Sequence, residues 1–323
     1  MDDSSQVGEA RRFALLICGY LDFDEVRTAK VSIIVNELGN NLVRYAQKGK
    51  LLFRILDFEN KSGFEIISID SGPGFVSTEQ VLADGFSTGS TPGTGLGAIK
   101  RQADLFDIFS VPGKGTVILA QIQREPKNKN EKYRIGAISI PLSGESVCGD
   151  AWVCKIDQED IKALVVDGLG HGPQANRAAD EAVNTFNEKS QMPLDQLLVN
   201  IHGRLKSTRG GAVFLVESKL GNEVFFLGVG NIRALVYDGQ RGRTLISQNG
   251  TAGLQMRTPR VLNQEWPLKS ILILHSDGIH SRWDFSEYPG ILNYHPSIVS
   301  AVIYRDFLRG NDDATVLVIS RGQ

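Results

Sequence analysis

The chain has 323 residues, of which 41% are hydrophobic and 22% charged, and its formal net charge is −2 at pH 7. These values are ordinary for a globular protein, and the length predicts about two domains of roughly 150 residues each. The near-neutral charge argues against nucleic acid as a partner. No apolar run approaches the ~20 residues that cross a bilayer, so we expect no membrane partner either.

Cysteine use and the first residues both favour a cytoplasmic protein. Cys18, Cys148 and Cys154 have no metal-ligand spacing and are typical of reduced thiols. Residues 1–5 are acidic and polar, whereas a secretory signal peptide has a basic start followed by an apolar run. We therefore expect a soluble protein in a reducing compartment.

The predicted elements of the first half alternate between helices and strands. Apolar residues at helical spacing predict helices over 8–19 and over 24–46, with Asp24 as the N-cap of the second. Three β-like runs follow, at 50–58, 64–70 and 116–122. A glycine-rich segment and a helix near 96–106 lie between the last two. This interleaving predicts an α/β sandwich.

A polar segment divides the chain. Residues 125–132 contain no apolar residue apart from one proline, and they lie between two β-like runs. The sequence therefore predicts a first domain over 1–124, a linker over 125–132 and a second domain over 133–323.

Strands predominate in the predicted second domain. They are expected at 135–140, 151–156, 161–166, 212–217, 223–229, 232–237, 270–275 and 314–319, with helices at 173–189, 194–207 and 297–308. Many strands with a few helices predict two packed sheets flanked by helices. The fold class is thus a two-domain α/β protein, with an α/β sandwich followed by a helix-flanked β-sandwich.

Three features of the first half have ordinary structural explanations when taken singly. Glu37 and Asn41 are four residues apart on the long predicted helix, where polar residues usually form a solvated face. Residues 70–75, Asp-Ser-Gly-Pro-Gly-Phe, suit a tight turn after a strand. Residues 89–97 run from glycines into a helix, where backbone N–H groups can approach phosphate oxygens.

Taken in order, these features resemble the motifs of the GHKL ATPase superfamily. Glu-x-x-x-Asn on a helix is followed by Asp-x-Gly-x-Gly, by Gly-x-Gly-x-Gly before a helix, and by Gly115-Thr116. The amino-acid sequence of residues 36–46 and 84–101 is most similar to that of the anti-sigma and switch-protein serine kinases of the RsbT type. The resemblance extends over about residues 10–122 and implies the GHKL, or Bergerat, α/β sandwich.

This resemblance implies a site for ATP with Mg²⁺. It implies that Asn41 coordinates the Mg²⁺ on the phosphates, and that Asp70, supported by Thr116, accepts a hydrogen bond from the adenine amino group. It makes Glu37 the candidate catalytic base toward a protein serine or threonine hydroxyl. Phosphoryl transfer needs mainly positioning and charge neutralisation, which this set of residues can supply.

The glycines of the motifs are expected to bind ATP through their backbone. The resemblance implies that Gly72 and Gly74 let the chain pass close to the adenine base. It implies that Gly93, Gly95 and Gly97 form a lid over the phosphates.

Four aspartates of the second half each adjoin an apolar β-like run. Asp150 precedes one run, Asp167 ends another within Asp-Gly-Leu-Gly-His-Gly, Asp277 follows a third, and Asp312 precedes the last. A single Asp-Gly is usually an ordinary turn, but carboxylates gathered without a cation would repel one another. Mg²⁺ and Mn²⁺ prefer such oxygen ligands, and two ions ~3.5–4 Å apart can activate a water for attack on phosphorus.

The order of these motifs, together with residues 228–231, resembles the SpoIIE/RsbX branch of the PP2C phosphatases over about residues 136–320. The resemblance implies a PP2C-like fold and two Mn²⁺ or Mg²⁺ ions. It implies that Asp167 bridges both ions, that Asp150 and the Gly168 carbonyl hold one, and that Asp277 and Asp312 hold the other.

Two positions of the second half have alternative interpretations. Asp312 is preferred to Asp313 as a ligand because it takes the first place in Asp-Asp-Ala-Thr. His171 is a candidate general acid, but the glycines around it equally predict a structural or supporting role in a shaped loop.

A kinase-like domain and a phosphatase-like domain in one chain predict a partner-switching regulator. The resemblances imply a STAS-domain protein as the phosphorylated partner, and a larger stress-signalling complex as the setting. A second hypothesis makes the ATP domain a regulatory or docking module that transfers no phosphate. A third makes both domains a catalytically inactive scaffold, although no expected metal ligand is missing.

Overall fold

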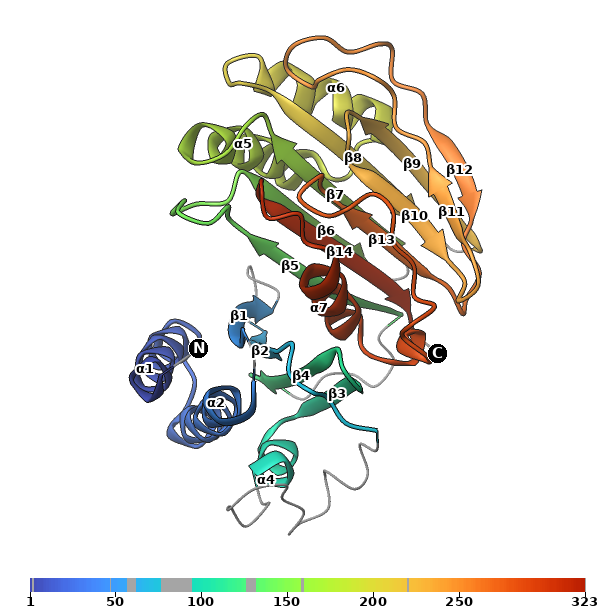
Figure 1. Cartoon of the computed structure of the whole chain (residues 1–323). Helices are drawn as coiled ribbons and strands as arrows, with labels where there is room; N and C mark the ends of the chain where they lie inside the picture. The colour runs from blue at the N-terminus through green and yellow to red at the C-terminus, as the bar shows by residue number, and fades with distance from the viewer. Residues whose placement is uncertain are drawn as a thin grey trace. The chain divides into compact units, whose positions relative to one another are not determined.

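The computed structural model divides into two compact units, Met1–Lys129 and Asn130–Gln323 (Figure 1). It describes residues 1, 3–46, 48–56, 62–76, 95–125, 132–157, 160–219 and 221–322. The first unit is an α/β sandwich and the second a β-sandwich flanked by helices, which confirms the predicted fold class. No helix in the described residues is long and apolar enough to cross a membrane.

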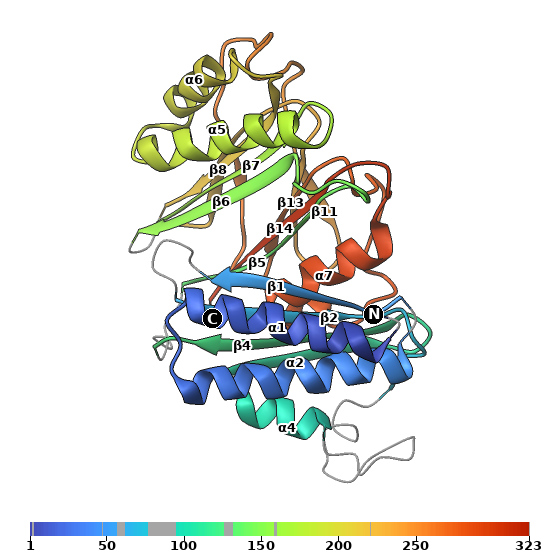
Figure 2. The same cartoon turned by 90° about the vertical axis from the view of Figure 1, so that its left-hand side faces the viewer.

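The first unit packs three described helices against one face of a sheet. The helices are α1 (Ser4–Tyr20), α2 (Glu25–Tyr45) and α4 (Gly95–Gln102). The antiparallel strands are β1 (Lys50–Leu56), β2 (Gly63–Ile69), β3 (Leu105–Val111) and β4 (Gly115–Gln123), in the order β1-β2-β4-β3. Figure 2 shows α1 and α2 running side by side along the sheet, with α4 beside α2.

Helix α2 forms as its sequence pattern predicts. Asp24 is the N-cap, and its Oδ1 accepts a hydrogen bond from the Arg27 backbone N–H at 2.7 Å. Val31, Ile34 and Leu38 recur at helical spacing and are fully buried in the core shared with the sheet. The apolar face of α2 therefore holds its polar residues Glu37 and Asn41 in set positions.

The predicted helix near 96–106 is too long, and strand β3 was missed. Helix α4 ends at Gln102, and Leu105–Val111 pairs with β4 along its whole length. Phe106 and Ile108 contact the core shared with the helices, at the period of two that is typical of a strand. Pairing with β4 thus overrides the helical pattern around residue 105.

The described residues of the second unit form two antiparallel five-stranded sheets. One has the order β11-β10-β13-β14-β5 and the other β12-β9-β8-β7-β6. The strands are β5 (Tyr133–Ile140), β6 (Asp150–Asp157), β7 (Asp160–Gly168), β8 (Gly211–Ser218), β9 (Glu223–Val229), β10 (Arg233–Tyr237), β11 (Gly242–Leu245), β12 (Leu262–Glu265), β13 (Ile271–His275) and β14 (Ala314–Arg321). The helices are α5 (Pro173–Lys189), α6 (Leu194–Leu205), α7 (Pro296–Phe307) and the short 3₁₀ helix η1 (Ile291–Asn293).

Strands β11 and β12 were not predicted. Each has only four residues, Gly-Arg-Thr-Leu and Leu-Asn-Gln-Glu, with a single apolar side chain apiece. Both are edge strands that pair with one longer neighbour, β10 or β9. Their β conformation therefore depends on tertiary pairing more than on their own residues.

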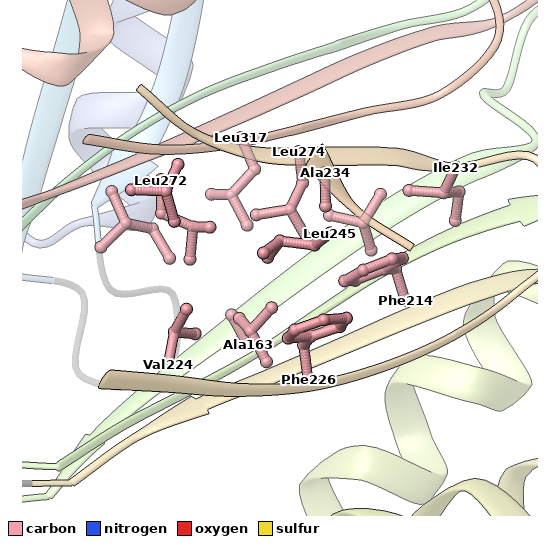
Figure 3. Close-up of a cluster of buried hydrophobic side chains, with 14 of the residues drawn as sticks. Ala163, Phe214, Val224, Phe226, Ile232, Ala234, Leu245, Leu272, Leu274 and Leu317 are labelled. Carbon is pink, nitrogen blue, oxygen red and sulfur yellow. The ribbon is translucent and has the colours of Figure 1, made fainter. Parts of the chain in front are cut away.

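The core of the second unit lies between its two sheets (Figure 3). Leu272, Leu274 and Leu317 from one sheet face Phe214 and Phe226 from the other, and these two phenylalanines stack with ring centroids 6.1 Å apart. Helices α5 and α6 cover the outside of one sheet, and α7 packs on β5 and β14 of the other. This apolar layer holds the strand ends, and the aspartates beside them, in one arrangement.

Candidate functional site

In the first unit, the predicted polar residues of α2 face the start of α4. A side chain begun at Gly95 would place its Cβ 2.7 Å from Glu37 Oε2 and 4.0 Å from Asn41 Oδ1. The glycine therefore lets the positive N-terminal end of α4 approach the carboxylate. Glu37, Asn41 and Gly95 lie together, as the motifs predict.

Asp70 lies at the end of β2, beside Thr116 on β4. Its Oδ1 accepts a hydrogen bond from Gly72 N–H at 2.7 Å, and its own N–H donates to the Thr116 carbonyl at 3.0 Å. The Thr116 hydroxyl is 3.1 Å from that of Ser110, which also accepts from Phe75 N–H at 2.9 Å. Ser110 was not predicted, yet it joins the Asp70 turn to the ends of β3 and β4.

The turn after Asp70 requires glycine at residue 74. Gly74 has a φ of +62°, and a Cβ there would lie 2.3 Å from the Val111 carbonyl oxygen. Gly97 is buried within α4. Gly93 and the motif residues 84–88 lie outside the described residues.

In the second unit, the four predicted aspartates come from neighbouring strand ends of both sheets. Asp150 and Asp167 are directly opposite each other in the β6–β7 pair. Asp277 follows β13 and Asp312 precedes β14, its antiparallel neighbour. Asp167, Asp277 and Asp312 line one cavity of about 510 Å³.

Burial and mutual repulsion disfavour negative charge on these carboxylates. Burial is the main cause of a raised pKa for Asp167, and the carboxylates of Asp150, Asp277 and Asp312 raise it further. Burial also raises the pKa of Asp150, partly offset by a hydrogen bond from the Ser276 hydroxyl. Such a cluster is stabilised in its charged form by cations.

Two residues that sequence reasoning did not assign hold Asp277. The Asn231 side-chain amide donates to Asp277 Oδ2 at 2.8 Å, and Arg309 Nη1 donates to the Asp277 carbonyl at 3.1 Å. Burial and the nearby Asp312 raise the pKa of Asp277, while Arg309 and Asn231 lower it. The sequence signal for Asn231 was its place at the end of Gly228-Val229-Gly230-Asn231.

Asp312 and Asp313 have different surroundings. Asp312 lines the cavity. Asp313 is 2% exposed, and its two carboxylate oxygens accept hydrogen bonds from the backbone N–H groups of Leu142 at 2.8 Å and Gly149 at 2.9 Å. Asp313 therefore already holds both ends of the β5–β6 loop, and Asp312 is the one of the pair whose surroundings suit a ligand.

The loop after Asp167 is shaped by a close approach at Gly168 and by a contact of His171 with Glu145. A Cβ at Gly168 would lie 2.3 Å from the Ala175 carbonyl oxygen, so only glycine allows helix α5 to start this close to the strand. His171 is exposed, and its Nδ1 is 2.5 Å from Glu145 Oε1. His171 is not among the residues that line the cavity. These contacts favour a supporting role for His171 in the loop.

The donor set fits hard divalent cations. Asp150 Oδ2 is buried and accepts no hydrogen bond from any described residue, so one carboxylate oxygen is available. Within the described ranges, no three His, Cys, Asp or Glu side chains converge closely enough to enclose an ion by themselves. A bound ion would therefore need further oxygens from backbone carbonyls and water, as Mg²⁺ commonly does.

Comparisons with known proteins agree with both units. Residues 2–122 match the family model of the histidine kinase-like ATPase domain. The chain is 37% identical over 111 residues to the serine/threonine-protein kinase RsbT of Bacillus subtilis (strain 168), which is 34% of this chain and 84% of RsbT.

The chain also resembles the phosphoserine phosphatase RsbX of Bacillus subtilis (strain 168), with 23% identity over 110 residues. This match spans 34% of the present chain and only 55% of RsbX. A crystal structure of RsbX in complex with magnesium shares its fold with 60% of this chain and 98% of its own, at a TM-score of 0.51 and 18% identity.

The chain therefore joins two classes of domain, a GHKL-type histidine kinase-like ATPase domain and a PP2C-type phosphatase domain. Through the first of these it belongs to the RsbT family of serine/threonine-protein kinases.

Proposed function

We propose that this protein is a bacterial partner-switching regulator that acts in both directions on a STAS-domain partner. Its second unit removes phosphate from a serine or threonine of that partner, and its first unit adds phosphate back from ATP. The observation that carries the proposal is the set of four aspartates at the strand ends of a PP2C-type fold, three of them lining one cavity. The similarity to RsbX and RsbT supports the two opposed activities.

The four aspartates would hold two Mn²⁺ or Mg²⁺ ions. Asp167 would bridge both ions, Asp150 and the Gly168 carbonyl would hold one, and Asp277 and Asp312 the other. Water would complete the coordination of each ion. When bound, such ions would lower the pKa of a water and neutralise charge on the phosphoryl oxygens.

The protein's own residues prepare this site. Asn231 holds Oδ2 of Asp277 by its hydrogen bond of 2.8 Å, which fixes the orientation of the carboxylate. Burial of Asp150, which is 4% exposed, excludes bulk water from one side of the carboxylate cluster. A phosphoserine side chain would enter from the open cavity that Asp167, Asp277 and Asp312 line.

The first unit is proposed to bind ATP with Mg²⁺ between α2, α4 and the Asp70 turn. Asn41 would hold the Mg²⁺, Asp70 with Thr116 would bind the adenine, and Glu37 would accept the proton of the partner's hydroxyl. Gly72, Gly74, Gly93, Gly95 and Gly97 would contact the nucleotide through their backbone. The proximity of Glu37 and Asn41 to Gly95 supports a common site for them.

The proposed setting is the cytoplasm, within a larger stress-signalling assembly that controls a sigma factor. The partner is identified by its chemistry as a STAS-domain protein with one phosphorylatable serine or threonine.

Intact-mass spectrometry of a candidate STAS partner tests both activities. With Mn²⁺ and no nucleotide, the phosphorylated partner should lose one phosphate in the presence of wild-type protein, but not with Asp167→Ala. With ATP and Mg²⁺, the unphosphorylated partner should gain one, and Asn41→Ala or Glu37→Ala should abolish the gain. Arg241→Ala, which removes an exposed surface charge, should match the wild type in both reactions.

Each half of the proposal can fail separately. Absence of phosphate loss with Mn²⁺, for every phosphorylated STAS partner tried, would refute the phosphatase assignment. Phosphorylation that survives Glu37→Ala unchanged would refute the role of Glu37. Tight ATP binding without phosphotransfer, together with a phosphatase rate that depends on ATP, would establish the first unit as a regulatory module.

A further inference from the structure

A rigid turn presents Arg209 beside the phosphatase cavity. The turn connects α6, which ends at Leu205, to β8, which begins at Gly211. The Thr208 hydroxyl donates to the Leu205 carbonyl at 2.7 Å and accepts from Gly210 N–H at 3.0 Å. These two bonds hold the backbone on both sides of Arg209.

The same turn is joined to the loop that follows Asp167. Leu169 N–H donates to the Gly210 carbonyl at 3.0 Å. Arg209 Nη1 lies only 3.3 Å from the position that a Cβ would take at Gly170. Leu169 and Gly170 both line the cavity, as does Asp167. Arg209 is not itself a lining residue, but its guanidinium group lies beside Gly170, which is, and so stands at the cavity rim.

Arg209 has no partner within the part of the chain that the structure describes, where its exposed guanidinium makes neither a hydrogen bond nor an ion pair. Arg309, a second arginine near the site, differs because its Nη1 donates to the Asp277 carbonyl. Three carboxylates line the cavity, and in the described residues none of them forms an ion pair with Arg209. The guanidinium group of Arg209 is thus held near the aspartates but is available to a ligand.

A phosphate ester is the ligand whose charge and shape suit this arrangement. It brings up to two negative charges into a cavity lined by carboxylates. The aspartates would offset the charge of bound metal ions, so the phosphate needs a further positive group. A guanidinium group can donate two parallel N–H bonds to two phosphate oxygens, which a lysine ammonium group cannot. Because hydrogen bonds already hold the backbone of the turn, less conformational entropy is lost when Arg209 binds a phosphate group.

We infer that Arg209 binds the phosphate group of the substrate at the rim of the phosphatase cavity. The inference rests on the proposed phosphatase function and adds a substrate-binding residue to it. Arg209 contacts phosphate oxygens and leaves the metal-binding residues undisturbed. Its removal should therefore weaken phosphate binding without changing the affinity for Mg²⁺.

Calorimetric titration of the full chain with inorganic phosphate, in saturating Mg²⁺, measures this binding without turnover. Arg209→Ala should bind phosphate about 10- to 100-fold more weakly than the wild type, as expected for the loss of charge-assisted hydrogen bonds. Arg209→Lys should recover part of the affinity because it restores the charge but not the two-pronged geometry. Arg241→Ala is the matched control, an exposed arginine on the β10–β11 turn whose loss should change nothing.

Steady-state kinetics supply the second readout. With a phosphoserine peptide and with p-nitrophenyl phosphate, Arg209→Ala should raise KM about 10- to 100-fold and lower kcat less, because the shared phosphate is the group bound. Wild-type affinity of Arg209→Ala for phosphate would overturn the inference, and so would a wild-type protein that binds no phosphate. If the wild type binds phosphate but hydrolyses no phosphoserine, the proposed function fails, while the calorimetric comparison still decides the role of Arg209.

Discussion

Replacing Asp167 with asparagine should stabilise the metal-free protein while abolishing its response to metal. Asp167 lies directly opposite Asp150 in the β6–β7 pair, and both carboxylates are largely buried. Without a cation, their repulsion opposes folding. An asparagine side chain is nearly the same size as aspartate but carries no charge, so Asp167→Asn removes the repulsion while the packing remains.

The β6–β7 register, which places Asp167 opposite Asp150, sets the expected gain in stability. Directly opposite residues of an antiparallel pair have Cα atoms about 4.5–5.5 Å apart. Two unit charges ~5 Å apart repel by about 3 kcal/mol at an effective dielectric constant of ~20. Partial protonation of the carboxylates in the wild type relieves part of this, so we expect a gain of about 1–3 kcal/mol. For a unit of this size, that gain corresponds to a Tm increase of about 2–10 °C in EDTA.

Differential scanning calorimetry of both proteins, in EDTA and then in Mn²⁺, measures the effect. Wild-type protein should be the less stable of the two in EDTA and should gain stability with Mn²⁺, whereas Asp167→Asn should gain little. Asp157→Asn is a suitable control because Asp157, at the far end of β6, is exposed and its charge is screened by water. A lower Tm for Asp167→Asn than for the wild type in EDTA would refute the electrostatic reasoning.

Four further substitutions test neighbouring parts of the site. Asp313→Asn should destabilise the fold by about 1–3 kcal/mol in urea titrations, since a buried backbone N–H loses its acceptor, whereas Asp312→Asn should abolish phosphatase activity with little loss of stability; equal effects on stability would contradict the assignment. Asn231→Ala should weaken Mn²⁺ binding about 10-fold by calorimetry, because Asp277 loses its orienting hydrogen bond; unchanged affinity would show that Asn231 does not orient the ligand. Burial lowers the pKa of His275 from 6.5 to about 4, so between these pH values the unfolded chain binds more protons and stability falls as the pH falls. In Mn²⁺-loaded protein, His275→Gln should flatten this pH dependence of the stability by up to about 3 kcal/mol, and an unchanged slope would count against it.

Much of the fold is readable from local patterns. The helical spacing of residues 173–189 and the capping of α2 by Asp24 are confirmed, because propensity, capping and core packing agree there. The exceptions are β3, β11 and β12, and the over-long helix before β3. In each of these, pairing with a neighbouring strand decides the conformation, and that neighbour is distant in sequence or has a stronger pattern.

The aspartates of the phosphatase site were found from sequence because each adjoins a long apolar strand, and a strand end is a place that local patterns can locate. Their roles as ligands remain predictions. Residues that act through a hydrogen bond gave a weaker signal. Asn231, Ser110 and Arg309 are single polar residues, and only the fold reveals which atoms they contact.

The sequence by itself determined the two classes of domain and the residues of their motifs, because these depend on short segments with definite backbone requirements. Tertiary structure alone decided how distant segments meet. It separated Asp313, which is bonded to two backbone N–H groups, from Asp312, which lines the cavity, although the two are neighbours in the chain. It also brought the Arg209 turn against the loop after Asp167, a distant segment of the chain, since pairing of β7 with β8 sets their separation in space and no local pattern records it.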